Sequence, residues 1–231
     1  RIGRWYKPWF YQYVRALAAK KKQGNVGTDF IPLRDYYHRH TRSLFWELQD
    51  IIPFGNNPLF RLLLGWAMPP KPSMLKMTQT EEIVQLYERF HVVQDMVVPI
   101  TTLAKSLEVM DENYRVYPLW LCPTALPKAG AGQGGIVESK TGTKDNMYID
   151  IGAYGVPGNK DYDAKRCGRA VEDYVRKVGG YQLLYADTYM TREEFEEMFD
   201  HTLYRKVRSK TPDGTKAFPE IYDKVCRDAR K

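Results

Sequence analysis

The sequence predicts an α+β protein with a ferredoxin-like β-α-β-β-α-β antiparallel sheet that carries both of its helices on one face. Three observations support this fold class. Residues 92–98 form an apolar run typical of a buried strand, and residues 147–153 alternate apolar and polar side chains. Residues 100–110 and 163–178 carry apolar side chains at helical spacing. The strand and helix patterns therefore alternate in the order that this arrangement requires.

Length and composition set the limits of the fold. The chain has 231 residues, of which 43% are hydrophobic, and this is enough to bury a sizeable core. We expect a ferredoxin-like domain over residues 91–231 that ends in further helices, preceded by a helical extension over residues 1–90. The second face of the sheet is then either covered by the extension or forms a wall of a site.

The chain is basic, with 35 Lys and Arg against 28 Asp and Glu and a formal net charge of +7. Such a balance favours anionic partners, which are nucleic acid, a phosphorylated cofactor or an anionic membrane surface. We expect no nucleic acid partner, because the basic residues are scattered and form no recognisable module. No apolar run approaches the roughly 20 residues that a membrane-spanning helix needs.

The cysteines and the first residue bear on the setting of the chain. Cys122, Cys167 and Cys226 match no metal or redox spacing, so we expect free thiols in a reducing compartment. The chain begins with Arg1 and shows no signal peptide, and we therefore expect it to start inside a longer protein.

Two segments of the extension leave alternatives open. Phe10, Val14 and Leu17 recur at helical spacing before a basic run at residues 20–22. This pattern predicts either a surface helix or a basic amphipathic helix that binds a membrane surface or calmodulin. Residues 59–68 are the most apolar segment, and they predict either a buried core helix or a helix that dips into one membrane interface.

Residues 36–58 join a polar start to an apolar helix pattern. His38, Arg39, His40 and Arg42 precede an amphipathic segment that ends before a turn, which is typical of a buried helix with a charged shoulder. Because His38 and His40 lie two positions apart, their side chains point to different faces, and we expect no metal site. Further along, Thr78 and Glu81 form a capping box that predicts another helix.

The remaining elements of the domain follow from local signals. A strand is expected at residues 115–122, where an internal proline indicates an edge strand or a bulge. Residues 124–145 are predicted to be a flexible surface loop. Residues 130–135 have the spacing G-x-G-x-x-G, but no helix pattern follows, so we reject a dinucleotide-binding loop. Asp161 and Asp163 are expected to start the second helix.

The end of the chain holds the second informative stretch. A last strand is predicted at residues 181–187, followed by a capping box of Thr191 and Glu194. If the strand persists, Tyr185, Asp187 and Tyr189 point to one face, where two phenols and a carboxylate can orient a ligand or pass a proton. The structural alternative is tyrosine packing on the sheet, with the aspartate capping a turn.

Several blocks of the sequence form a recognisable series. The first blocks are YHRHTRS at 37–43, FWE at 45–47 and PFG at 53–55. The later blocks are HVVQDM at 91–96, YPLWLCP at 117–123, DIGAYG at 150–155, LYAD at 184–187, REEF at 192–195, MFD at 198–200 and AFPEIYDK at 217–224. Together they resemble the delta-24 sterol reductase family, whose members are FAD-dependent enzymes of the vanillyl-alcohol-oxidase type related to the plant dwarf/diminuto proteins. The likeness covers nearly the whole chain, apart from residues 15–28 and 124–145.

The resemblance implies that the chain is the C-terminal substrate (cap) domain of a flavoenzyme whose FAD-binding domain lies N-terminal to it. It implies FAD and NADPH as cofactors, and reduction of the double bond between carbons 24 and 25 of a sterol side chain. It also implies sterol biosynthesis at the endoplasmic reticulum membrane, facing the cytosol, with the anchor outside this chain. We expect this stretch alone to be inactive and to bind FAD weakly or not at all.

The candidate site residues follow from the same resemblance. Tyr185, Asp187 and Tyr189 are the candidates for catalysis, because protonation must assist hydride transfer to an isolated double bond. The candidates for binding the flavin or the NADPH phosphate are Tyr37, His38 and Arg42. The alternative left open is a non-catalytic module that binds calmodulin or a membrane through its N-terminal helix.

Overall fold

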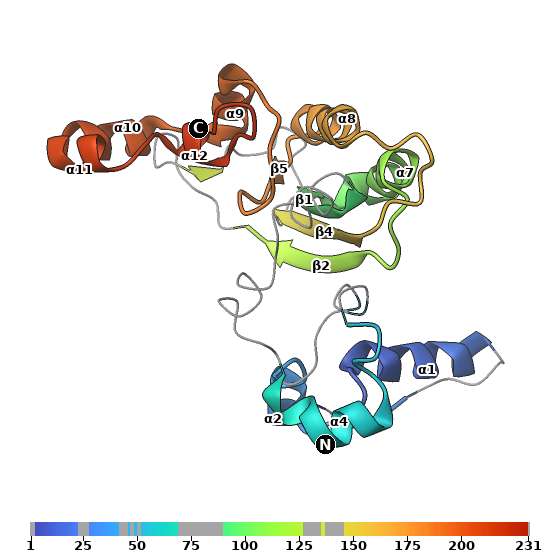
Figure 1. Ribbon diagram of the computed structural model, residues 1–231. Helices are drawn as coiled ribbons and strands as arrows, with labels where there is room; N and C mark the ends of the chain where they lie inside the picture. The colour runs from blue at the N-terminus through green and yellow to red at the C-terminus, as the bar shows by residue number, and fades with distance from the viewer. Residues whose placement is uncertain are drawn as a thin grey trace. The chain divides into compact units, whose positions relative to one another are not determined.

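A computed structural model describes residues 3–22, 28–41, 46, 49, 52–68, 90–126, 135–136 and 146–230. The chain divides into two compact units, Arg1–Glu81 and Glu82–Lys231 (Figure 1). The predicted boundary lay between residues 90 and 91. The helix predicted from Thr78 and most of the amphipathic segment after residue 41 lie outside the described residues.

The first unit is helical in the part that the structure describes. Its helices are α1 (Phe10–Lys22), α2 (Leu33–Tyr37) and α4 (Pro58–Leu64), and the short 3-10 helix η1 (Gly65–Ala67) continues α4. The helix predicted around Phe10 is therefore confirmed. α4 begins where expected, because the Asn57 side chain accepts hydrogen bonds from the backbone N–H groups of Leu59 and Phe60.

A buried tryptophan holds the first unit together. Trp9 is fully buried, and its backbone N–H donates to the side-chain oxygen of Asn56 over 2.8 Å. Its indole ring lies so close to Gly55 that a Cβ there would come within 2.5 Å of the ring atom Cζ2. Only glycine permits this approach, which explains the Gly in the turn that precedes α4.

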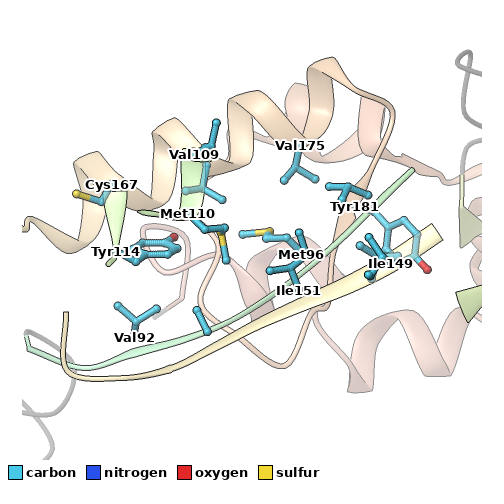
Figure 2. Packing of buried hydrophobic residues seen from close by; sticks show 14 of the residues in the cluster. Val92, Met96, Val109, Met110, Tyr114, Ile149, Ile151, Cys167, Val175 and Tyr181 are labelled. Atoms are coloured by element: carbon cyan, nitrogen blue, oxygen red, sulfur yellow. The ribbon is translucent and has the colours of Figure 1, made fainter. Parts of the chain in front are cut away.

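The second unit is built on a four-stranded sheet with the strand order β2-β4-β1-β5 and antiparallel pairing throughout. Its strands are β1 (Val92–Pro99), β2 (Trp120–Ala125), β4 (Met147–Gly155) and β5 (Tyr181–Gln182). The helices α7 (Leu103–Asn113) and α8 (Ala164–Lys177) lie on the same face (Figures 1 and 2). The α+β class is confirmed, and the strand order and pairing are compatible with a ferredoxin-like arrangement.

The core lies between these two helices and the sheet. Met96 and Ile151 point from neighbouring strands towards Met110 of α7 and Val175 of α8, and all four side chains are at most 3% exposed (Figure 2). Burial of each such side chain contributes roughly 1.5–3 kcal/mol to folding. Because side chains alternate along a strand, the residues next to Met96 and Ile151 point to the opposite face of the sheet.

Several predicted boundaries need correction. The strand predicted at residues 115–122 is displaced to β2, so that Pro118 precedes the strand instead of lying inside it, and β2 is an edge strand. The last strand is much shorter than predicted, because the chain turns after β5 and Ala186 N–H donates to the Leu183 carbonyl. The loop predicted at 124–145 contains a short strand, β3 (Gly135–Ile136), while residues 127–134 and 137–145 lie outside the described residues.

Other local predictions are confirmed. Asp163 caps α8, with its side chain accepting from the backbone N–H of Arg166. The capping box of Thr191 and Glu194 is present in full at the start of α9 (Arg192–Met198). The strand β6 (Phe199–Asp200), which pairs with β3, follows α9, and after it come α10 (Thr202–Ser209), α11 (Pro212–Ala217) and α12 (Ile221–Val225). None of the helices in the described part of the chain is long and apolar enough to cross a bilayer.

Candidate functional site

A pocket of about 200 Å³ lies in the second unit, beside the start of β1 and the segment after β5. It contains all three side chains that the sequence proposed for catalysis, Tyr185, Asp187 and Tyr189. They do not lie along one strand, because β5 ends at Gln182. The turn after β5 brings them together instead. The other lining residues are His91, Val92, Val93, Gln94, Tyr114, Tyr162, Ala164 and Ala186.

The pocket wall is mainly aromatic and neutral. Burial raises the pKa of Tyr114 well above its ordinary value, and burial likewise raises the pKa values of Tyr162 and Tyr189. These phenols therefore stay protonated at neutral pH. Their rings offer electron-rich faces that can contact an apolar group or stabilise a developing positive charge.

Asp187 is engaged in ion pairs. Its carboxylate accepts from Arg227 over 2.6 Å and also pairs with Arg230. The same C-terminal residues are held against the segment by the backbone, because Arg227 N–H donates to the Thr188 carbonyl over 2.9 Å. This arrangement fixes the segment that carries Tyr185 and Tyr189. It gives Asp187 a positioning role in the structure, while the catalytic role stays a prediction.

Tyr185 connects the pocket to a buried acid. Its side chain is 62% exposed, and its hydroxyl lies 3.1 Å from the hydroxyl of Tyr154 on β4. The Tyr154 hydroxyl in turn lies 2.5 and 2.6 Å from the two carboxylate oxygens of Asp95 on β1. Asp95 is only 3% exposed. An exposed phenol is thus linked by hydrogen bonds, through a second phenol, to a carboxylate inside the sheet.

Asp95 and Tyr154 were not singled out as site residues from the sequence. One signal for Asp95 was present, since a carboxylate interrupts the apolar run VVQDMVV at 92–98. A carboxylate inside an otherwise apolar strand usually belongs either to a structural ion pair or to a functional site. No local pattern identified Tyr154, because its contact with Asp95 depends on the register of β1 and β4.

Two of the residues proposed for cofactor binding lie in the first unit. Tyr37 is 69% exposed and closes the five-residue helix α2, and His38 follows it at the helix end. Arg42 lies outside the described residues. Among the described residues, the pocket lining contains no Lys or Arg, and the pocket volume is below the roughly 300–1,000 Å³ typical of sites for whole drug-sized ligands. This pocket therefore does not fit a dinucleotide, whose pyrophosphate needs cations or backbone N–H donors.

The arrangement can serve a limited set of ligands. The pocket has room for a short alkyl end of a larger apolar molecule, and Tyr185 is one of its lining residues. Among the described residues, no group of three or more His, Cys, Asp and Glu side chains is placed to hold a metal ion. Tyr185 is the group through which a proton can pass between the ligand and the interior of the sheet.

Comparison with known proteins gives consistent relatives. The chain is similar to the human Delta(24)-sterol reductase, with 55% identity over 229 residues that cover 99% of this chain and 43% of the human protein. It is 48% identical to the Caenorhabditis elegans Delta(24)-sterol reductase homolog, over all of this chain and 42% of that protein. It is 41% identical to the Arabidopsis thaliana Delta(24)-sterol reductase, over 90% of this chain and 39% of that protein. No family model and no solved structure matches.

Proposed function

Because this chain belongs to the delta(24)-sterol reductase family, we propose that it forms the substrate-binding part of an enzyme that reduces the double bond between carbons 24 and 25 of a sterol side chain. The chain spans less than half of the length of the curated relatives it matches, so the proposal concerns the full-length protein. The observation that carries it is the similarity to these reductases over nearly the whole chain.

The pocket supports this proposal through its size and lining. A sterol ring system needs more room than about 200 Å³, whereas the branched end of its side chain needs little. Aromatic rings from Tyr114, Tyr162 and Tyr189 suit an apolar chain, and they tolerate positive charge at a carbon that is being protonated. We therefore assign the reacting end of the sterol to this pocket.

FAD and NADPH are part of the proposal for the full-length enzyme, as donors of the hydride. The pocket does not fit them, for the reasons of volume and charge given above, so we derive no step through either group. Their sites belong to other parts of the full-length protein, and Tyr37, His38 and Arg42 remain proposed contacts. The stretch Arg1–Lys231 is expected to be inactive alone.

The membrane setting is also a proposal, in keeping with an apolar substrate made during sterol biosynthesis at the endoplasmic reticulum. In the first unit, Leu63 and Trp66 are each 60% exposed, and Leu59 is 65% exposed. These side chains are thus outside the core, in contrast to the core alternative for residues 59–68. We assign them to contact with a membrane interface. Replacing Leu63 and Trp66 by Ser should reduce flotation with liposomes and leave the melting temperature unchanged within about 2 °C.

One experiment tests the central proposal. The full-length protein is purified, its absorption spectrum is examined for a bound flavin, and NADPH is added with a sterol that has the double bond at carbon 24. We expect consumption of NADPH and a product with a saturated side chain. The matched control is the same sterol with the side chain already saturated, which should consume no NADPH. A flavin-free protein that leaves the double bond intact would contradict the proposal and favour a non-catalytic module that binds a membrane or calmodulin.

A further inference from the structure

The hydrogen-bonded group of Asp95, Tyr154 and Tyr185 is not needed to hold the sheet together, because apolar side chains at these positions could do the same. Asp95 sits within a strand whose other buried neighbours are mostly apolar, and it lies on the sheet face away from α7 and α8. Among the described residues, no Lys or Arg pairs with it. A buried carboxylate without a cation costs folding free energy, so an apolar residue here would stabilise the sheet.

Gly152 makes room for this group. It lies directly opposite Asp95 in the pairing of β1 with β4. A Cβ at this position would come within 2.7 Å of the Tyr154 hydroxyl and still closer to the carboxylate of Asp95. The close approach of the acid and the phenol therefore depends on the absence of a side chain at residue 152.

A second carboxylate lies on the same face. Asp150 is opposite Val97, one step along the pairing from Asp95 and Gly152, so the two acids are diagonal neighbours. Its buried oxygen Oδ1 has no hydrogen-bond partner among the described residues. Burial, with the charge of Asp95 as the second cause, raises the pKa of Asp150 to about 7. Burial also raises the pKa of Asp95, opposed by the hydrogen bond from Tyr154.

The other titratable groups near the pair do not supply a cation. Tyr181 on β5 lies in the same row of the sheet as Asp150, since both are paired with Val97. Burial first, and then the charge of Asp150, raise the pKa of Tyr181 to about 12, so it stays neutral. Tyr148 of β4 and Cys122 of β2 complete this face. Asp95 therefore has a second carboxylate as its diagonal neighbour on the sheet, and burial raises the pKa of both acids.

Resting on the function proposed above, we propose that Asp95, Tyr154 and Tyr185 form a proton relay that protonates the side-chain double bond, with the Tyr185 hydroxyl in contact with the substrate. The two hydrogen-bonded steps, 2.5 Å and 3.1 Å, are within the reach of proton transfer. Asp95 is too buried to touch a ligand, whereas Tyr185 is exposed and lines the pocket.

In this step, the π electron pair of the double bond forms a C–H bond with the proton that leaves the Tyr185 oxygen, and the other carbon becomes electron-deficient. The hydride donor of the full-length enzyme would supply the electron pair and the second hydrogen to that carbon. Tyr185 regains a proton from Tyr154, and Tyr154 regains one from Asp95. Asp95 then regains its proton from water.

The test uses the full-length protein and compares matched tyrosines. Tyr154→Phe and Tyr185→Phe keep the ring and remove the hydroxyl. Tyr117 is the control, because it is 63% exposed, lies outside the pocket, and its hydroxyl also donates to a carboxylate, that of Asp111, over 2.8 Å. We expect Tyr154→Phe and Tyr185→Phe to lower kcat about a hundredfold with KM changed less than about threefold, as for loss of a general acid. Tyr117→Phe should match the wild type.

Two further readouts separate a relay from a packing role. In the wild type, a solvent deuterium isotope effect on kcat and a fall of activity above about pH 7 are expected, and Asp150→Asn should move this fall. Difference infrared spectra of the full-length protein should show the C=O band of a protonated carboxylic acid, lost in Asp95→Asn or Asp150→Asn. This band does not depend on turnover.

The outcomes are distinct. An active wild type whose Tyr154→Phe and Tyr185→Phe variants turn over normally overturns the relay and leaves the proposed function intact. An active wild type without the carboxylic acid band at pH 6 overturns a protonated carboxylic acid on the sheet as the proton source. A wild type that shows the band but reduces no sterol contradicts the proposed function, and with it the assignment of the relay to this reaction.

Discussion

Two groups of buried or half-buried carboxylates in the second unit differ in how their charge is compensated. Near α9 and the C-terminus, Asp187 pairs with Arg227 and Arg230, and Glu194 pairs with Arg169 and Arg176. We call this group the arginine clasp. On the sheet, Asp95 accepts a hydrogen bond from Tyr154 and has Asp150 as a diagonal neighbour, and no described Lys or Arg pairs with either acid.

The carboxylates that pair with arginine stabilise the fold, whereas the carboxylates without a described cation do not. The charge-assisted pairs of the arginine clasp join α8, α9 and the chain end, and each such bond contributes about 1–3 kcal/mol where it is shielded from water. The sheet carboxylates lack this compensation and lower the stability of the fold. Groups of this kind with shifted pKa values concentrate at functional sites, which favours a relay on the sheet over one in the arginine clasp.

The largest effect is expected from Gly152→Ala. The added methyl group would occupy the space shared by Asp95 and Tyr154, so one of them must rotate away and the hydrogen bond between them is lost. We expect a loss of about 1–3 kcal/mol in stability from overpacking, together with a fall in kcat of about a hundredfold if the relay operates. Denaturant unfolding and steady-state kinetics of the full-length protein measure the two effects.

The control for this substitution is Gly214→Ala in α11. A Cβ at Gly214 would make only ordinary contacts of 3.5 Å with Thr211, and the position is helical. This variant should be slightly more stable than the wild type, by about 0.4–1 kcal/mol, with unchanged kcat. Equal kinetics for the two alanine variants would show that the close approach at Gly152 is only a packing detail.

In the arginine clasp, Arg169→Met should lower the stability of the fold and leave proton transfer unchanged, in contrast to substitutions in the relay. The Arg169 guanidinium donates to both carboxylate oxygens of Glu194, over 2.5 and 2.8 Å, and is largely shielded from water. We expect the free energy of unfolding to fall by about 2–3 kcal/mol, because Glu194 loses a bidentate partner. Lys105→Met is the matched control, since its pair with Glu108 is exposed to water and should contribute little to stability.

Arg169→Met also sharpens the comparison kinetically. At a temperature where the variant is folded, its solvent isotope effect should equal that of the wild type, because the relay is untouched. If the fully folded Arg169→Met variant showed no solvent isotope effect, the arginine clasp would be part of the proton-transfer pathway.

The sequence predicted much of the scaffold and less of the site, and the reason is the range of the interactions involved. Local patterns sufficed for α8 and α9, because Asp163 and the Thr191–Glu194 box cap helices within four residues of chain. The last strand was overestimated, because LLYAD has strand-like composition while the chain turns after Gln182.

The site depended on contacts between distant residues. Tyr185, Asp187 and Tyr189 were identified and do share one pocket, although on a turn instead of a strand. The relay partners Asp95 and Tyr154 come from different strands, and only the register of β1 and β4 brings them together. The partners of Asp187 lie 40 or more positions further along the chain, at Arg227 and Arg230, where no local pattern announces them.

The pH dependence of stability offers a third test of the comparison. Asp150 has a pKa raised to about 7 in the folded chain, above its unfolded value, so the folded state binds the proton more tightly. Its stabilising contribution is present below the unfolded pKa of about 4 and is lost as the pH rises through about 7. Glu194 behaves in the opposite way, because its hydrogen bonds to Arg169 lower its pKa, and its contribution is lost only in acid.

In Asp150→Asn, the change in the free energy of unfolding between pH 5 and pH 8 should therefore be smaller than in the wild type by about 2 kcal/mol. Glu172 must be considered in the same range, since burial raises its pKa to about 7 as well. The variant Glu172→Gln should remove a separate part of the slope, and the two effects should add because Glu172 lies on α8 whereas Asp150 lies on the sheet face away from α8. A slope unchanged in Asp150→Asn would mean that this acid is ionised throughout.

The smallest effect is expected from Asp187→Asn, the substitution that bears most directly on the catalytic role predicted from the sequence. Asp187 lines the pocket, yet its carboxylate is held by Arg227 and Arg230 and is 31% exposed. Loss of these partly exposed pairs should cost about 1 kcal/mol. Because the segment that carries Tyr185 is then held less firmly, KM should rise about threefold while kcat changes less. The solvent isotope effect should persist, as the proton passes through Tyr185 and not through Asp187. A fall in kcat as large as the one expected for Tyr185→Phe, with the isotope effect lost, would assign the acid role to Asp187 and remove the distinction between the two groups of carboxylates.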